Sequence, residues 1–407
     1  MCSWKKGNNV LFCITGGIAA YKMPEVVHTL VKEGNTVRVL LTRAAERFVT
    51  PFLFATLTKE QVFREEDFLN DATGWTIPHI SLAEWADLLV VAPCTANSLK
   101  IIARGESHLL LGGVFLASPR RGVLFPSMNT HMWEHPMTTL YAEECRNLGH
   151  HVVEPAEGRL ACGTVGRGKM QDNTHILEEL WRALAPVKNL QGKRVLVTAG
   201  PTWEFLDPVR FLSNPSSGKM GYALAREAWY RGADVTLLTG PVCEGNMYGL
   251  QHIPVVSAQE MGEEMERLRD VYDILLMAAA VGDYRFQQKS SHKIKRQGRG
   301  TLEMDLVQNP DLLARAGAVK KEHQILLGFA AETEDLLENA QKKLIQKNAD
   351  YMAANSVGGE KTAFGSSRNT VTLLDRDGRS RTFEGSKSQV AAAILDAISP
   401  SEGTGLS

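Results

Sequence analysis

The sequence predicts an α/β protein with two doubly wound parallel-sheet domains, residues 1–189 and residues 190–407. A chain of 407 residues is long enough to bury two separate cores. In the first half, short apolar strands alternate with helical patterns, which is typical of parallel sheets. The alternation restarts after the polar connector NLQGK at residues 189–193, so the second half is predicted to repeat the architecture.

Each predicted element of the first half rests on its local pattern. The apolar run VLFCITGG is typical of a buried strand, and the helical pattern after it ends at Gly34, since glycine commonly terminates helices. The runs DLLVVAP and GVLFPSM have the length of buried parallel strands. The predicted strands are residues 10–17, 36–42, 87–93 and 122–128, and the predicted helices are residues 24–34 and 176–185.

The second half follows the same logic. KRVLVTAGPT opens it as a strand, and ADVTLLTG follows the next helix. Near the end, Asp377 and Gly378 separate two strand patterns, which predicts an antiparallel hairpin at the edge of the sheet. Ligands of such folds bind at the carboxyl ends of the strands. The predicted strands are residues 193–202, 233–240, 273–284 and 324–333, with a helix at 219–232 and the hairpin at 370–385.

The overall composition excludes several classes of protein. Lys plus Arg number 45 against 46 for Asp plus Glu, so no net field attracts nucleic acid or an anionic membrane surface. The apolar runs are far shorter than the roughly 20 residues of a membrane helix. The six cysteines show no CxxC spacing, which argues against a zinc ribbon or a disulfide framework. With no secretory signal pattern, the sequence predicts a cytoplasmic protein without nucleic-acid or membrane partners.

Two loops of the first half have the composition of anion sites. TGGIAAYK follows the first strand, and the backbone of Gly16, Gly17, Ile18 and Ala19 can hold a phosphate or form a plain tight turn. It is not a GxGxxG fingerprint. The second strand ends in Thr42 and Arg43 instead of an acidic residue, which favours a mononucleotide phosphate over NAD.

Polar residues after later strands are further candidates. Thr95, Asn97 and Ser98 start a helix, where they suit a phosphate or a flavin edge but equally suit helix capping. In PSMNTHMW, Met128 precedes Asn129, whose amide can orient a ligand carboxylate or cap a turn. His79 lies just before a helix, where a structural role competes with a chemical one.

The stretch RLACGTVGRGKM at residues 159–170 shows neither helical nor strand periodicity. Its Cys162 has Arg159, Arg167 and Lys169 nearby, and such charges lower a thiol pKa from its usual value of about 8.5. Taken alone, Cys162 is a generic reactive thiol.

In this order and spacing, the motifs resemble those of the flavin-dependent cysteine decarboxylases, closest to the phosphopantothenoylcysteine decarboxylase family, over residues 8–180. The resemblance implies a flavodoxin-like domain in which FMN accepts a hydride from the carbon bearing sulfur. It implies His79 as a base or electrostatic partner, Asn129 as a carboxylate clamp, and Cys162 as a proton donor on a glycine-flanked flap. The implied FMN-binding residues are Gly16, Gly17, Ile18, Ala19, Thr42, Thr95, Asn97, Ser98 and Met128.

The second half contains a different set of motifs. In DPVRFLSNPSSGKMG, the Ser-Ser-Gly helix start is a good anion site, and Arg210 and Asn214 precede it within reach of a carboxylate. Lys343 and Lys347 are i,i+4 and therefore share a helical face, which is most often simply solvated. AAAVGDYR, QNPDLLA and GFAAET follow strands or open a helix.

These motifs resemble the phosphopantothenate–cysteine ligase family over residues 190–398. The resemblance implies a Rossmann-like domain that uses CTP and Mg²⁺ to form an acyl cytidylate, with metal ligands not identified. Lys293 is implied to stabilise the reacting phosphate, and Arg210 and Asn214 to hold the substrate. Asn309 is expected as the N-cap of a helix with Pro310 at its first position. The implied nucleotide-binding residues are Met277, Ala278, Ala279, Asp283, Lys293, Asn309, Pro310, Asp311, Leu312, Phe329, Lys343 and Lys347.

Over nearly its whole length the chain resembles the bacterial bifunctional coenzyme A biosynthesis proteins. The resemblance implies the substrates 4′-phosphopantothenate, L-cysteine and CTP. It also implies a homo-oligomer of ligase-domain dimers and decarboxylase-domain trimers, up to a dodecamer. Cys94, Gly282 and Lys169 depart from the family pattern, and Gly282 is expected to loosen the nucleotide loop. The competing hypotheses are a two-domain flavin or nicotinamide oxidoreductase and a non-catalytic nucleotide or flavin sensor.

Overall fold

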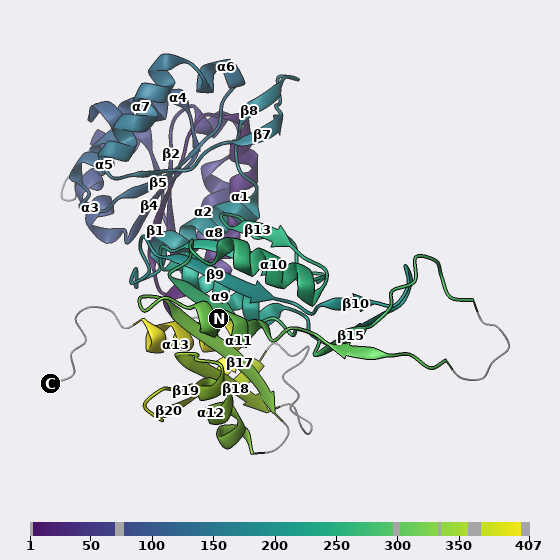
Figure 1. Cartoon of the computed structure of the whole chain (residues 1–407). Helices are drawn as coiled ribbons and strands as arrows, with labels where there is room; N and C mark the ends of the chain where they lie inside the picture. Colours follow the sequence, from purple (N-terminus) through teal and green to yellow (C-terminus); the bar gives the residue numbers. More distant parts are fainter. Residues whose placement is uncertain (1–2, 70–76, 296–301, 333–334, 357–367, 400–407) are drawn as a thin grey trace. The chain divides into compact units, whose positions relative to one another are not determined.

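The structure, a computed structural model, describes residues 3–69, 77–295, 302–332, 335–356 and 368–399. The chain divides between Pro186 and Val187 into two compact units (Figure 1). Each unit is built on its own predominantly parallel sheet with helices on both faces. The predicted fold class is therefore confirmed. Among the described residues, no helix is both long enough and apolar enough to cross a membrane.

The first unit contains a six-stranded parallel sheet in the order β3-β2-β1-β4-β5-β6. The strand order reverses between β1 and β4, and such a switch point is where doubly wound sheets bind ligands. All residues of β4 and β5 are buried, as expected for strands covered on both faces. The bounds are β1 Asn9–Ile14, β2 Thr36–Leu41, β3 Val62–Arg64, β4 Leu88–Cys94, β5 Gly122–Pro126 and β6 His151–Val152.

Two groups of helices cover this sheet. On one face, α1 packs against α2 and α8. On the other face, α3, α4, α5 and α7 enclose a core that includes Leu11, Leu89 and Leu99. The bounds are α1 Met23–Lys32, α2 Pro51–Thr58, α3 Pro78–Trp85, α4 Ala96–Arg104, α5 Leu110–Ala117, α6 Thr130–Trp133, α7 Pro136–Asn147 and α8 Asn173–Leu184, with 3₁₀ turns at Ser3–Lys5, Ile18–Lys22, Ala45–Arg47 and Glu65–Leu69.

The stretch around Cys162, for which the sequence shows no periodicity, forms an antiparallel hairpin of β7 (Ala156–Arg159) and β8 (Val165–Lys169). Backbone contacts of a glycine in β8 fix the position of this hairpin against the end of β5. The backbone N–H of Met128 donates to the carbonyl of Gly168 at 3.0 Å. A Cβ on Gly168 would lie 2.4 Å from the Met128 carbonyl oxygen, so a larger residue would push the hairpin away from the sheet.

The second unit contains an eight-stranded sheet in the order β13-β12-β9-β14-β17-β18-β19-β20. Strands β13 to β18 in this order are parallel, and β19 and β20 are antiparallel. The predicted hairpin at the sheet edge is present, with Gly378 at φ +79° in its turn. The bounds are β9 Arg194–Ala199, β12 Asp234–Thr239, β13 Gln251–Pro254, β14 Ile274–Met277, β17 Ile325–Glu332, β18 Tyr351–Ser356, β19 Arg368–Asp375 and β20 Ser380–Ser386.

Helices again cover both faces of this sheet. Helices α9 (Lys219–Tyr230) and α13 (Lys387–Ile398) pack together on one face. Helices α10 (Ala258–Leu268), α11 (Leu312–Val319) and α12 (Leu336–Gln346) enclose a second core on the other face. The second unit therefore buries its own core, as the length of the chain suggests.

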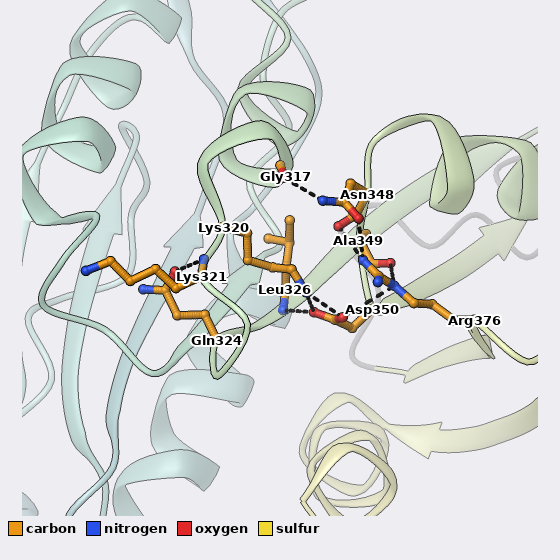
Figure 2. A network of polar contacts seen from close by, with 9 residues as sticks. All are labelled: Gly317, Lys320, Lys321, Gln324, Leu326, Asn348, Ala349, Asp350 and Arg376. Atoms are coloured by element: carbon orange, nitrogen blue, oxygen red, sulfur yellow. Dashed lines mark hydrogen bonds and ion pairs between the residues drawn. The ribbon is translucent and has the colours of Figure 1, made fainter.

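A polar network fixes the amino ends of β17 and β18 (Figure 2). Both carboxylate oxygens of Asp350 accept from Nζ of Lys320, at 2.6 and 2.7 Å, and Asp350 also accepts from the backbone N–H of Leu326. The Arg376 guanidinium donates to the carbonyls of Asn348 and Ala349 at 2.8 Å. Strand β17 begins at this network, and Phe329 nearer its other end lines a cavity. The network therefore fixes the end of β17 that lies away from the cavity.

Four short strands form an arm that extends from the second sheet (Figure 1). Two antiparallel ribbons build it, and β10 packs on β15. The rings of Trp203 and Phe211 stack at 4.2 Å between centroids. The single strand predicted over residues 273–284 is too long, because β14 ends at Met277 and Tyr284 opens a strand of the arm. The bounds are β10 Trp203–Phe205, β11 Phe211–Ser213, β15 Tyr284–Phe286 and β16 Leu306–Gln308.

Candidate active sites

A cavity of about 1110 Å³ opens at the carboxyl ends of β1, β2, β4 and β5 in the first unit. Residues from loops far apart in the sequence line it together with Asn129 and Cys162. All nine predicted flavin-binding residues are among them. The fold therefore brings these residues to one cavity, while their roles in binding stay predictions. They are Gly16, Gly17, Ile18, Ala19, Thr42, Thr95, Asn97, Ser98 and Met128.

Thr15, which was not among the predicted site residues, joins two of these loops. Its hydroxyl donates to the carbonyl of Pro93 at 2.7 Å and accepts from the backbone N–H of Thr95 at 3.3 Å. A Cβ on Gly16 would lie 2.4 Å from the Cβ of Ala44, so glycine lets the first loop approach the end of β2. Threonine directly before a glycine pair at a strand end is the signal that could have identified it.

The start of α4 shows helix capping. Thr95 is the N-cap, and its hydroxyl oxygen accepts from the backbone N–H of Ser98 at 3.3 Å and lies 2.9 Å from the Ser98 hydroxyl. Asn97 is exposed and lines the cavity. Capping therefore occurs at Thr95, and the positive end of the α4 dipole faces the same cavity.

Asn129 and Cys162 meet at the mouth of the cavity. Oδ1 of Asn129 caps α6 by accepting from the backbone N–H of His131 at 2.9 Å. With Oδ1 engaged, Nδ2 is directed at Sγ of Cys162, 3.3 Å away, and at the Thr164 hydroxyl at 3.5 Å. The cap thus orients the amide so that its donor side faces the thiol, and an amide N–H in that position suits an anionic ligand group.

Hydrogen bonds lower the pKa of Cys162 to about 7, the largest contribution coming from Thr164 and a further one from Asn129. The thiol lies 3.1 Å from the Thr164 hydroxyl. The direction of the shift agrees with the prediction from the sequence, but the predicted cause, the basic neighbours, is wrong. Arg167, for example, pairs with Glu154 at 2.9 Å.

We predict that Thr164→Val moves the alkylation profile of Cys162 to higher pH. The thiolate reacts and the thiol does not, so the rate with iodoacetamide should reach half its maximum near pH 7 in the unchanged protein. Removing the hydroxyl destabilises the thiolate, which raises the pKa. The reaction is followed by mass spectrometry of the peptide containing Cys162, and an unchanged midpoint would show that another group sets the pKa.

His79 lies at the start of α3 and does not line the cavity. Its ring packs edge-on against Phe68, with 5.3 Å between centroids. Its buried Nδ1 has no hydrogen-bond partner among the described residues. The chemical role of His79 therefore stays a prediction.

The second unit has a cavity of about 460 Å³ at the carboxyl ends of β14 and β17. Asn214 lines it, and its Nδ2 donates to the carbonyls of Ala280 and Val281 at 3.3 and 3.0 Å. Apart from Lys293, all predicted nucleotide-binding residues line it too. They are Met277, Ala278, Ala279, Asp283, Asn309, Pro310, Asp311, Leu312, Phe329, Lys343 and Lys347.

The predicted start of α11 is wrong by two residues. The N-cap is Asp311, whose carboxylate accepts from the backbone N–H of Ala314 at 2.9 Å. Asn309 is buried and makes tertiary contacts instead, since its Nδ2 donates to the carbonyl of Gly282 at 2.8 Å and its Oδ1 accepts from Arg285 at 3.2 Å. Its amide is therefore unavailable for capping and holds two loops of the cavity together.

The loop at Gly282 is held on both sides, so the expected loosening is not observed. Its N–H donates to the Thr202 hydroxyl at 2.9 Å, and its carbonyl accepts from Asn309. A Cβ there would lie 3.4 Å from the nearest atom, in Glu204, which is ordinary contact distance.

Gly282→Ala should therefore raise the free energy of unfolding by about 0.4–1 kcal/mol, because alanine restricts the unfolded chain without strain in the folded one. Gly218→Ala is the matched control. There φ is +75° and a Cβ would lie 2.9 Å from Val242, so we expect a loss of at least about 1–2 kcal/mol. The midpoints of urea unfolding measure both, and a destabilised Gly282→Ala would contradict the prediction.

Arg210 and Lys293 lie outside the cavity lining, and Asp207 links their two segments. The carboxylate of Asp207 accepts from the Arg210 guanidinium at 2.8 Å and from the backbone N–H of Ile294 at 3.1 Å. Burial opposes ionisation of Asp207, but hydrogen bonds from Val209, Ile294 and Arg210 outweigh it and lower its pKa. Asp207 thus positions the residue next to Lys293. This role of Asp207 was not predicted from the sequence.

Comparison with protein families identifies the class of each half. Residues 3–185 match the family described as Flavoprotein. Residues 190–401 match the family described as DNA/pantothenate metabolism flavoprotein C-terminal domain. The fold and the two cavities thus belong to a two-domain flavoprotein of this class.

Full-length relatives narrow the class. The coenzyme A biosynthesis bifunctional protein CoaBC of Bacillus subtilis is 41% identical over 394 residues, with 96% of each chain covered. Its namesake in Vibrio cholerae is 39% identical over 393 residues, covering 96% of this chain and 98% of the relative. A solved C-terminal domain of such a protein is 38% identical and covers 52% of this chain and 96% of its own, with a TM-score of 0.45. This chain belongs to the family of coenzyme A biosynthesis bifunctional proteins, which confirms the resemblance.

Proposed function

We propose that the chain catalyses two consecutive steps of coenzyme A biosynthesis. The second unit joins 4′-phosphopantothenate to L-cysteine with CTP and Mg²⁺, and the first unit decarboxylates the product to 4′-phosphopantetheine with FMN. The observation that carries the proposal is the Cys162 thiol, held 3.3 Å from the Asn129 amide at the mouth of a flavin-sized cavity. The family gives no support to the oxidoreductase hypothesis.

The residues of the first cavity fit FMN. Its volume of about 1110 Å³ is slightly above the usual range for ligand pockets, about 300–1,000 Å³, which leaves room for a ligand as large as FMN. Hydroxyl groups, backbone amides of the Gly16 loop and the N-terminus of α4 suit a phosphate. When bound, FMN would accept a hydride from the carbon that carries sulfur and return it to the ene-thiol after CO₂ has left, so that the overall oxidation state is unchanged.

The chain's own groups then have two tasks in decarboxylation. The amide of Asn129 holds the carboxylate that leaves as CO₂. Cys162 gives a proton to the ene-thiol that remains, and a pKa of about 7 keeps much of the thiol protonated near neutral pH.

In the ligase unit, a carboxylate must be activated before an amine can displace its oxygen. The carboxylate oxygen of 4′-phosphopantothenate attacks the α-phosphorus of CTP, and pyrophosphate leaves with the electron pair of the broken bond. The cysteine amine then displaces CMP. Lys293 stabilises the charge on the reacting phosphate, and Asn214 with Arg210 holds the acyl cytidylate.

Several further proposals accompany this function. Lys293 is exposed and lies outside the lining of the cavity, and we propose that its side chain approaches the nucleotide during the reaction. We also propose a homo-oligomer, with ligase dimers, decarboxylase trimers and a dodecamer as its largest form, working in the cytoplasm where its substrates are made. We propose further that Mg²⁺ enters bound to the phosphates of CTP, the usual way in which this ion reaches nucleotide sites.

One assay tests the whole proposal. The protein is incubated with 4′-phosphopantothenate, cysteine, Mg²⁺ and either CTP or ATP, and pyrophosphate and CO₂ are followed separately. We expect pyrophosphate first and CO₂ afterwards, with CTP preferred. NADH oxidation without either product would support the oxidoreductase hypothesis, and ligand binding without CMP formation would support the sensor.

A further inference from the structure

Helices α10 and α11 of the ligase unit are held together at both ends. Near the start of α11, glycine at position 262 lets the helices approach, since a Cβ there would lie 2.9 Å from Cδ2 of Leu312. Beyond their last turns, Nζ of Lys321 pairs with the carboxylate of Asp270 at 2.5 Å. The two helices therefore run in the same direction, with a contact before and after the groove that they share.

A cavity of about 580 Å³ in this groove is lined by residues of both helices. Its volume is within the usual range for small-ligand pockets, about 300–1,000 Å³. Part of the lining is apolar. Met265 of α10 and Leu312 and Ala316 of α11 are buried, and Val319 at the end of α11 is 47% exposed. The groove therefore suits the apolar body of a small molecule.

Tyr272 lines the same cavity and has a hydroxyl group without a hydrogen-bond partner among the described residues. The residue is 6% exposed and belongs to the second core. Burial, together with the nearby carboxylates of Glu266 and Asp270, raises the pKa of Tyr272 to about 12, so the hydroxyl stays protonated and can donate. Because a buried hydroxyl without an acceptor is costly, a ligand in the cavity that supplies one is favoured.

Arg315 of α11 is exposed and supplies the charge of the groove. Of the charged residues that line the cavity, it alone makes no side-chain hydrogen bond or ion pair with the described part of the chain. Its guanidinium can therefore receive a carboxylate without breaking an existing contact. The other charged lining residues are engaged: Glu263 accepts from Gln259 at 3.0 Å, Arg269 pairs with Glu266 and with Asp270, and Arg285 donates to Asn309 at 3.2 Å.

We propose that this groove is a second ligand site of the ligase unit, for a small monocarboxylate whose apolar body ends in a hydrogen-bond acceptor. The carboxylate pairs with Arg315, the apolar body lies along Leu312 and Val319, and the acceptor takes the hydrogen bond of Tyr272. The site uses neither the nucleotide nor Lys293, so it goes beyond the proposed ligation and stands independently of it. Leu312 also lines the nucleotide cavity, so the nucleotide is kept present in the test.

Ligand-observed NMR titration of the full chain, with FMN, CTP and Mg²⁺ present, tests the site with three matched probes. Monomethyl suberate carries a carboxylate and an ester carbonyl, dimethyl suberate lacks the charge, and octanoate lacks the acceptor. We expect the unchanged protein to bind monomethyl suberate about tenfold more tightly than dimethyl suberate and about threefold more tightly than octanoate, because a hydrogen bond to a charged group contributes more than a neutral one.

Two variants separate the polar contacts. Arg315→Met should abolish the preference for monomethyl suberate over the diester. Tyr272→Phe should abolish the preference over octanoate while keeping the ring that packs in the core. Arg267→Met is the matched control, because Arg267 is an exposed residue of α10 that pairs with Glu264 at 2.5 Å and does not line the cavity. It should leave the affinities for all three probes unchanged.

Three outcomes would overturn the assignment. They are a lack of saturable binding of monomethyl suberate to the unchanged protein at millimolar concentration, equal affinities for the three probes, and losses in Arg267→Met as large as those in Arg315→Met. Since the Tyr272 hydroxyl has no partner among the described residues, Tyr272→Phe should not lower the midpoint of urea unfolding, which separates a lost contact from a lost fold. Pyrophosphate release is not part of this titration, so failure of the proposed ligation would leave the result on the groove intact.

Discussion

Cys162→Ser is expected to stop formation of 4′-phosphopantetheine while CO₂ is still released in a single turnover. Loss of CO₂ needs only the hydride acceptor and the carboxylate clamp, and Asn129 is untouched by the substitution. The final step adds a hydride and a proton to the ene-thiol, and a serine hydroxyl is too weak an acid to give the proton. A positioned acid is worth about 10²–10⁴ in rate, so we expect product formation to fall by that factor.

The measurement compares CO₂ from labelled phosphopantothenoylcysteine with the yield of thiol product. Cys243→Ser is the matched control, because Cys243 is also exposed but lies in the ligase unit. It should leave both yields unchanged. A normal yield of 4′-phosphopantetheine from Cys162→Ser would show that another group donates the proton.

The pKa of Cys162 bears on this role. The basic residues of the stretch suggest a thiolate nucleophile, and on that view a proton donor would need a flap that keeps the pKa high. With a pKa of about 7, set by Thr164 and Asn129, the group suits a general acid near neutral pH without that requirement. Product formation should therefore decline as the pH rises above 7, because the protonated fraction falls.

Much of both cavities could be predicted from the sequence because their residues follow buried strands directly. A run such as DLLVVAP specifies a strand by composition, and the residue after it, Thr95 in this case, must then lie at the ligand edge of the sheet. The same reasoning applies to Asp283 and Phe329, which lie after or within the strand patterns of the second half. Local patterns suffice where the fold itself brings the residues together.

The remaining features depend on tertiary contacts that local patterns do not encode. The hairpin around Cys162 lacks an apolar alternation because Gly168 packs backbone against backbone. Asn309 has the composition of an N-cap, but its amide is engaged by Gly282 and Arg285. Asp207 acts through Ile294, a residue 87 positions away. None of these partners can be identified from the neighbouring residues in the chain.

Lys293→Gln is expected to abolish ligation while decarboxylation of added phosphopantothenoylcysteine continues. Glutamine keeps much of the length of the side chain but removes the charge that stabilises the reacting phosphate. Removing one such stabilising donor typically costs about 10²–10³ in turnover. Pyrophosphate release measures ligation and CO₂ release measures decarboxylation. Lys289→Gln is the matched control, because the Lys289 amine packs 5.4 Å from the Phe205 ring of the arm and should not take part in the reaction.

The structure adds a second variant that separates positioning from charge. Asp207→Asn leaves Lys293 intact but weakens the contacts to Arg210 and to the N–H of Ile294. If Lys293 acts from a positioned segment, Asp207→Asn should lower ligation less than Lys293→Gln and should add little when the two are combined. Independent, additive losses would mean that Asp207 supports only the fold of the arm. Loss of decarboxylation in either variant would contradict the assignment of the two activities to separate units.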